Sequence, residues 1–307
     1  MPEIVTVLGP VPAERLGLTL PHEHVLCDFI GADRTGPHRW DREAVYRRML
    51  PLLEEAHAAG VRSFFDCTPA YIGRDPELLR RLARATGLNI VTNTGYYKEP
   101  FLPPHAFAES EDALAARWVA ECEKGIDGTG IRPGFIKIAV NPAPLVPVQR
   151  KVVRAAARAQ RRTGLAIACH TGHAGAAMEA LDLLAEEKAP AGRFIVVHAD
   201  AIEDRREHLR IWDRGAWVEF DAVGWKPIEH HAELISSFLK ERGPDRLLIS
   251  HDAGWYWAGE PDGGRQKPFT PLLKELVPAL HRAGVTTATI HQLLVTNPAR
   301  VFAVRRP

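Results

Sequence analysis

The chain has 307 residues, with 46% hydrophobic residues, 25% charged residues and a formal net charge of +1. This composition is typical of globular proteins, and the length suits one large α/β domain or two small ones. The balanced charge and the absence of any basic run longer than two argue against binding to nucleic acid, and no apolar stretch approaches the roughly 18 residues of a membrane span.

The beginning of the chain and its cysteines indicate a cytoplasmic protein. Residues 1–7 lack a basic region followed by an apolar one, so no signal peptide is expected. The four cysteines, Cys27, Cys67, Cys122 and Cys169, include no C-x-x-C pair. In a chain of this length, that pattern favours reduced thiols over a disulfide framework.

In chain order, a short β-hairpin comes first and a series of alternating strands and helices follows. Val5–Val7 and the turn at Gly9 and Pro10 predict the hairpin. From residue 18 onward, apolar runs rich in Val, Ile and Phe are typical of parallel strands covered on both faces. The predicted strands are Leu18–His24, Val61–Cys67, Asn89–Thr94, Gly134–Val140, Leu165–His170, Arg193–His198, Ala216–Phe220 and Arg246–Asp252.

Amphipathic stretches between these strands predict helices. Asp75 before Pro76 is typical of a helix start, and Gly87 is typical of a helix end. Val148, Val152, Ala156 and Ala159 lie on one face at helical spacing. The other predicted helices are Asp41–Ala59, Ala174–Glu187, Glu203–Arg214, Glu229–Glu241, Pro271–Arg282 and Thr287–Phe302.

Eight strand–helix units predict an α/β fold of the TIM (β/α)₈ barrel type. We expect a single domain over residues 1–307, with the hairpin in 1–17, the barrel in 18–285 and an extra C-terminal helix in 286–307 that closes the underside of the barrel. The Gly- and Pro-rich stretch Gly259–Pro268 is expected to form a loop over the top face. An open doubly wound sheet is the alternative, but no G-x-G-x-x-G motif follows an early strand.

Potential metal ligands gather at the predicted carboxyl ends of the strands. His22 and His24 lie two residues apart on one strand and therefore face the same way. His170, His198 and Asp252 end three later strands, and all these ends meet at one rim of a barrel. Each of them alone is compatible with a hydrogen-bonded histidine or a capping aspartate. Together they favour a metal site.

Lys137 lies within the apolar strand Gly134–Val140, where burial of an unpaired ammonium group is costly. One interpretation is a lysine that pairs with a buried carboxylate or extends to the rim. The other is a neutral lysine that reacts with carbon dioxide to give an anionic carbamate, whose two oxygens can bridge two metal ions.

This order of H-x-H, Lys, His, His and Asp resembles the phosphotriesterase-like branch of the amidohydrolase superfamily, which includes phosphotriesterase-related proteins and lactonases. The resemblance covers nearly the whole chain. It also includes the segments Ile72–Asp75, Ala85–Val91, Thr94–Tyr97, Gly134–Lys137 and Thr296–Arg300.

The resemblance implies a centre of two divalent metal ions. His22, His24 and Asp252 would hold the buried ion, and His170 and His198 the more exposed one. Lys137, carboxylated on Nζ by CO₂, would bridge both ions together with a hydroxide. The resemblance implies zinc first, with manganese, cobalt or iron as alternatives, and a homodimer.

Hydrolysis of an ester bond is the reaction that this resemblance implies. The metal pair would generate the bridging hydroxide, and Asp252 would accept and pass on the proton. Tyr97 matches a tyrosine near the metals that would hydrogen-bond the polarised oxygen; simple packing of Tyr97 is equally compatible. His251 is expected to face away from the metals.

This chain departs from the family pattern at the positions that distinguish phosphotriesterases from acyl-homoserine lactonases. The Asp and His that relay protons in phosphotriesterases fall at Ala201 and Ala222, and the Arg of acyl-homoserine lactonases also falls at Ala222. The resemblance assigns no role to the nearby Asp200 and Asp221.

The loops of the top face carry candidate substrate-binding residues. Lys226 and Arg265, with Lys98, Asn141 and Lys267, would suit an anionic substrate, although each of them taken singly fits a solvated surface charge better. Trp225, Trp255, Tyr256 and Trp257 either wall a pocket or pack the base of a loop.

A lactonase or other carboxylic-ester hydrolase acting on a small molecule is the leading hypothesis, because a lactone needs little protonation of its leaving group. The alternatives are an organophosphate triester hydrolase and a metal-binding barrel without catalysis.

Overall fold

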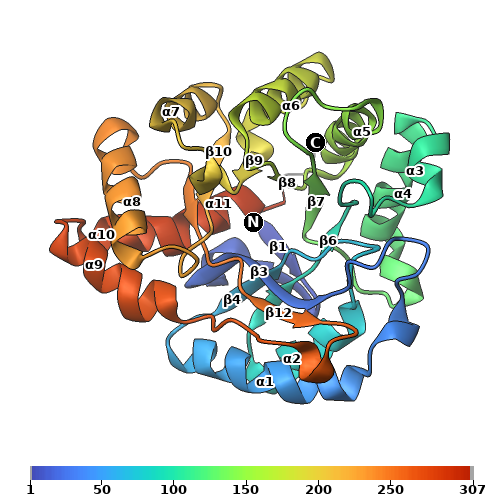
Figure 1. Ribbon diagram of the computed structural model, residues 1–307, viewed down its shortest axis with the longest axis horizontal. Helices are drawn as coiled ribbons and strands as arrows, with labels where there is room; N and C mark the ends of the chain where they lie inside the picture. Colours follow the sequence, from blue (N-terminus) through green and yellow to red (C-terminus); the bar gives the residue numbers. More distant parts are fainter. Residues whose placement is uncertain (1, 305–307) are drawn as a thin grey trace.

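A ring of parallel strands lies at the centre of the molecule, and helices surround it in chain order, from α1 in blue through α5 in green to α8 in orange (Figure 1). The computed structural model describes residues 2–304. Residue 1 of the predicted hairpin segment and residues 305–307 of the predicted C-terminal segment lie outside the described residues. The fold is the predicted TIM barrel.

The barrel strands pair in parallel and in sequence order. Their bounds are β3 Thr19–Cys27, β4 Ser63–Asp66, β5 Asn89–Val91, β6 Asn93–Thr94, β7 Phe135–Ala139, β8 Ile167–His170, β9 Phe194–Val197, β10 Trp217–Phe220, β11 Leu247–Ile249 and β12 Gly254–Trp257. Only Thr92 separates β5 from β6, so they form one barrel strand. β11 and β12 together form the last strand, and the pairing of β12 with β3 completes the ring.

The helices begin and end where short-range signals place them. Asp41 and Asp75 cap α1 and α2 through side-chain hydrogen bonds to backbone N–H groups, and Gly87 ends α2 with φ of 74°. The bounds are α1 Arg42–Ala58, α2 Pro76–Thr86, α3 Pro104–Ala108, α4 Glu111–Lys124, α5 Pro147–Thr163, α6 Ala174–Glu186, α7 Arg205–Asp213, α8 Ile228–Arg242, α9 Val277–Arg282, α10 Thr287–His291 and α11 Asn297–Phe302. Among the described residues, no helix combines the length and apolarity that crossing a membrane requires.

Three features differ from the predicted elements. The predicted helices Pro271–Arg282 and Thr287–Phe302 each contain a π-helical segment, at Leu272–Leu276 and Gln292–Thr296. The helices α3 and α4 were not predicted, although Ser110 caps α4 and the buried pair Leu114 and Trp118 is spaced as on a helix face. The strand β12 was also missed, because the eighth barrel strand is interrupted at Asp252, whose backbone is left-handed with φ of 51°.

The N-terminal hairpin and α11 close the lower end of the barrel. Strand β1 (Glu3–Thr6) pairs in antiparallel fashion with β2 (Gly9–Pro12). Phe302 of α11 packs against Phe65 and Phe135, with ring centroids 4.1 and 5.6 Å apart. Ile4 and Trp217 belong to the same buried cluster. This apolar layer fills the barrel below the predicted metal ligands, so the polar groups lie at the opposite end.

Candidate metal centre

The first three predicted ligands, His22, His24 and Asp252, lie together at the carboxyl ends of the first and last barrel strands. Asp252 Oδ1 lies 3.1 Å from His24 Nε2 and 3.7 Å from His22 Nε2. One ligand atom from each of the three residues falls within 4.8 Å of the others. Lys137 Nζ lies 3.4 Å from the same His22 Nε2. Two imidazoles, a carboxylate and an amine thus share one buried space.

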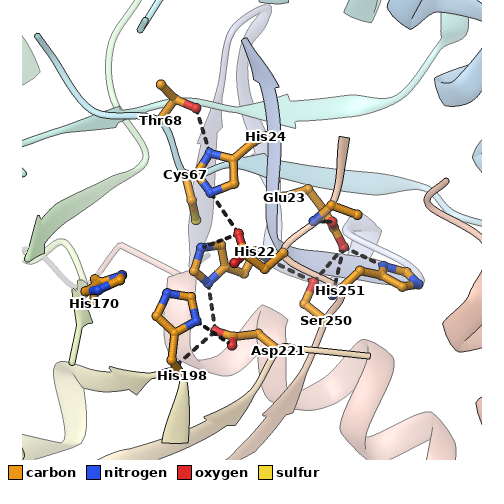
Figure 2. Close-up of polar contacts among 12 residues, drawn as sticks. His22, Glu23, His24, Cys67, Thr68, His170, His198, Asp221, Ser250 and His251 are labelled. Atoms are coloured by element: carbon orange, nitrogen blue, oxygen red, sulfur yellow. Dashed lines mark hydrogen bonds and ion pairs between the residues drawn. The ribbon is translucent and has the colours of Figure 1, made fainter. Parts of the chain in front are cut away.

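His198 and His170 extend this cluster toward the next strands. The His198 ring lies 5.0 Å from the His22 ring and 4.5 Å from the His170 ring, between centroids. His170 ends β8 and His198 directly follows β9, where its backbone is left-handed with φ of 59°. Non-glycine residues rarely adopt this conformation, and it tends to occur at functional sites. Figure 2 shows His22, His24 and His198 gathered together, with His170 to one side of them.

Asp221 joins two of these histidines. Its carboxylate accepts hydrogen bonds at 2.8 Å from His22 Nδ1 and at 2.7 Å from His198 Nδ1, and it is fully buried (Figure 2). A proton on each Nδ1 leaves both Nε2 lone pairs free to bind a cation. His24 Nδ1 is similarly engaged by Thr68 Oγ1 at 2.7 Å. The residue type and strand-end position of Asp221 are visible in the sequence, but its contact with both histidines is not.

The electrostatic environment favours the neutral ring in two of the proposed histidine ligands. Burial lowers the pKa of His22 and His170 well below the usual value, aided by Lys137 and His198 respectively. His198 differs: burial alone would lower its pKa, but the Asp221 carboxylate raises it above the ordinary value. Burial alone would raise the pKa of Asp252, but the hydrogen bond with His24 and the neighbouring His22 hold it below its ordinary value. Neutral imidazoles and an ionised carboxylate are the forms that bind metal.

These residues fit a metal centre by the chemistry of their donors. Imidazole nitrogen and carboxylate oxygen suit zinc, manganese, cobalt or iron. Lys137 is 1% exposed, and no carboxylate forms an ion pair with it anywhere in residues 2–304. The nearest support for the alternative, a lysine paired with a buried carboxylate, is Glu219, which is buried and interacts with Lys137 electrostatically without forming a close ion pair.

Tyr97 and Lys98 contact the ring of His170 from the loop after β6. The Tyr97 hydroxyl lies 3.2 Å from His170 Nδ1, and Lys98 Nζ lies 2.9 Å from His170 Nε2. Tyr97 also packs edge-on against Phe29, with ring centroids 5.6 Å apart. Tyr97 therefore both packs in its loop and presents its hydroxyl at the centre.

Aromatic side chains border the centre on the side of strand β12. The Trp255 ring lies 4.1 Å from the His24 ring and 5.3 Å from the Trp257 ring. The indoles of Trp225 and Trp255 both donate to Asp252 O, at 3.1 and 2.7 Å. The Trp225 ring remains half exposed. These tryptophans thus fix the base of the loop and also border the centre, whereas Tyr256 is buried and packs beneath the loop.

The predicted cationic residues Lys226 and Arg265 line a common cavity of about 880 Å³. Lys267 also lines it, and its ammonium group lies over the Trp225 ring. The cavity reaches Ala253, the residue after Asp252. The cavity thus gathers cations from the loops after β10 and β12, together with Glu229 and Glu275, but none of the proposed metal ligands lines it.

His251 lies on the opposite side of the strand end from the ligands. Its Nδ1 lies 2.6 Å from Glu23 Oε1, and its Nε2 accepts a 2.9 Å hydrogen bond from Leu272 N. An asparagine at this position keeps a donor for Glu23 but leaves the Leu272 N–H without its acceptor.

We expect His251→Asn to lower the free energy of unfolding by about 1–3 kcal/mol, the cost of one unsatisfied buried donor. Metal content and hydrolytic rate should stay within threefold of the wild type. Denaturant unfolding and metal analysis on the same sample check both statements. A variant of unchanged stability that loses its metal would contradict this prediction.

Comparison with known proteins relates this chain to the phosphotriesterase family. The model of the phosphotriesterase family matches residues 2–302. The phosphotriesterase homology protein of Escherichia coli is 32% identical, over 93% of this chain and 98% of its own. The aryldialkylphosphatase of Saccharolobus solfataricus is 27% identical, over 95% and 97%. A crystal structure of a PTE-like lactonase variant from Deinococcus radiodurans superposes with a TM-score of 0.86 at 32% identity, over 98% of this chain and 100% of that one.

Proposed function

The chain belongs to the phosphotriesterase family, and from this membership we propose that it is a metal-dependent hydrolase of carboxylic esters with lactones as its preferred substrates. The observation that carries the proposal is the contact of Asp252 with both His22 and His24, with the Lys137 amine in the same buried space.

We assign His22, His24 and Asp252 to one divalent ion and His170 and His198 to a second. Lys137 would bridge the two as a carbamate, which forms when its neutral amine adds to CO₂ and releases a proton. Zinc is the proposed native metal, because histidine-rich sets with one carboxylate are typical of catalytic zinc sites. When bound, the ions would lower the pKa of a water molecule and polarise the carbonyl oxygen of the substrate.

The side chains of the protein would then orient the substrate and handle the proton. Asp252 is ionised, so it can accept a proton from the attacking water. Burial raises the pKa of Tyr97, so its hydroxyl remains protonated and can donate to the carbonyl oxygen. Trp225 and Trp255 would cover the apolar part of the substrate. Lys226 and Arg265 would bind an anionic group at its far end.

A lactone suits this site better than a phosphotriester does. Ala201 and Ala222 stand where phosphotriesterases carry a proton relay, and the Ala222 N–H donates to Asp200 Oδ2 at 2.8 Å. Ring opening of a lactone leaves the alkoxide tethered to the product, so it depends less on such a relay. The Deinococcus neighbour is named a lactonase and the Saccharolobus relative an aryldialkylphosphatase, so phosphotriester hydrolysis is the second candidate.

A panel of γ- and δ-lactones tested beside the phosphotriester paraoxon distinguishes these candidates. With zinc-loaded protein, we expect kcat/KM for the best lactone to exceed that for paraoxon at least tenfold, and we expect the metal-free protein to be inactive. A higher value for paraoxon would favour the second candidate. Absence of turnover with every compound would favour a metal-binding barrel without catalysis.

We also propose a homodimer in the cytoplasm. None of the four cysteines forms a disulfide, which supports a reducing compartment. The dimer rests on the family resemblance, and light scattering after gel filtration tests it.

A further inference from the structure

The carboxylate of Glu23 is buried between the first barrel strand and the end of the last one, and within residues 2–304 its hydrogen-bond partners all lie on the segment that carries Asp252. Its Oε1 accepts from Ser250 Oγ at 2.9 Å and from His251 N at 3.2 Å, and it lies 2.6 Å from His251 Nδ1. Its Oε2 accepts from Ala253 N at 2.9 Å. Figure 2 shows Glu23 facing Ser250 and His251.

All four of these partners act as donors. Because Leu272 N donates to His251 Nε2, the ring proton of a neutral His251 lies on Nδ1 and points at Glu23. Charge-assisted hydrogen bonds to main-chain and side-chain donors are a strong way to hold a buried carboxylate. The Glu23 carboxylate thus forms a rigid template for residues 250–253.

Asp252 lies at the centre of this template in an unfavourable backbone conformation. Its φ is 51°, a value that is uncommon for non-glycine residues and costs free energy unless the surroundings compensate for it. Strand β3 imposes it from both sides, since His22 O accepts from Asp252 N at 3.1 Å and Ala253 O accepts from His24 N at 2.9 Å. The strand that carries His22 and His24 therefore also sets the direction of the Asp252 side chain.

We propose that Glu23 is a positioning residue that holds Asp252 against His22 and His24 and thereby sets the affinity of this site for its divalent ion. Glu23 itself binds neither metal nor substrate. The inference rests on the ligand assignment made above, but not on the identity of the substrate.

The test is the zinc affinity of Glu23→Gln, measured by competition with a chromogenic chelator. An amide offers one acceptor oxygen and places an NH₂ group against a donor, so the 250–253 segment must shift. We expect the affinity for one of the two zinc ions to fall tenfold to 100-fold, the usual effect of losing a group that orients a ligand. With the zinc-loaded variant, kcat should fall while KM for the lactone stays unchanged.

A second readout needs no metal. In the metal-free variant, the amides of residues 251–253 should exchange with deuterium at least tenfold faster than in the wild type, while the remaining barrel amides are unaffected. A general loss of stability would instead accelerate exchange throughout the barrel.

Two variants control for a merely structural effect. Glu121→Gln weakens the bidentate ion pair with Arg74, in which Glu121 Oε1 and Oε2 each accept at 2.8 Å, and it should lower stability without changing zinc affinity. His251→Asn keeps a donor to Glu23 and should likewise retain zinc. If Glu23→Gln does not fold, Ser250→Ala removes one donor to Glu23 and the acceptor of His22 N, and should weaken zinc binding threefold to tenfold.

Zinc affinity of folded Glu23→Gln within twofold of the wild type would overturn the inference, and so would an equal loss in Glu121→Gln. A wild-type protein that binds two zinc ions but opens no lactone would sink the proposed function alone, because the zinc affinities still decide the role of Glu23.

Discussion

Replacement of Lys137 by alanine is expected to remove most of the bound metal and to lower hydrolytic activity at least 1000-fold. The Lys137 side chain is 1% exposed, and its Nζ lies 3.4 Å from His22 Nε2, so its removal leaves a buried gap beside a proposed ligand. Loss of a bridging anion leaves two cations repelling each other in a buried site. A 1000-fold loss of rate corresponds to about 4 kcal/mol of transition-state stabilisation.

The measurement is the number of metal ions per chain together with kcat, with and without added acetate. A short carboxylate fits the space that the removed side chain leaves, and it should restore part of both quantities. Lys98→Ala is the matched control, since it removes an amine from the same centre, beside His170, and should retain both ions. Two ions per chain in Lys137→Ala would contradict the bridging role.

Replacement of Asp221 by alanine is expected to lower activity at least 100-fold and to weaken the binding of both ions. The two oxygens of this carboxylate hold His22 Nδ1 and His198 Nδ1, and each histidine is assigned to a different ion. Without the acceptor, both rings can rotate or place the proton on Nε2, where it blocks metal binding.

Asp221→Asn provides a graded comparison, because its single carbonyl oxygen can accept from only one of the two histidines. We expect its metal affinity to lie between those of the wild type and Asp221→Ala. Titration with zinc followed by calorimetry gives all three values. Metal affinity of Asp221→Ala within threefold of the wild type would show that the rings are held by packing alone.

The sequence predicts the barrel and the strand-end residues well because both depend on local patterns. Alternating apolar runs and caps such as Asp75 are short-range signals, and the convergence of His22, His170 and His198 follows once the strands close into a barrel. The interruption at Asp252 is different, because its left-handed backbone depends on hydrogen bonds from a strand at the other end of the chain.

Local sequence patterns do not predict the carboxylates that orient the ligands. Asp221 is 199 residues from His22, and Glu23 is 228 residues from His251. Nothing in the local sequence of either carboxylate specifies its partner, because Asp221 after β10 and His251 after β11 come close to the first strand only when the barrel closes. For the same reason, the sequence does not show that Tyr256 packs beneath the loop whereas its neighbours Trp255 and Trp257 remain partly exposed.

The apolar layer that closes the lower end of the barrel determines how small molecules reach the metal centre. Below the ligands, the interior is filled by Phe65, Phe135, Trp217 and Phe302. In the part of the chain that the structure describes, the centre therefore opens to solvent at its rim. Metal ions, carbon dioxide, substrate and product would all enter and leave through the same opening at the rim. A product analogue bound at the rim should therefore slow the extraction of metal by chelators, because it blocks the route by which the ions reach solvent.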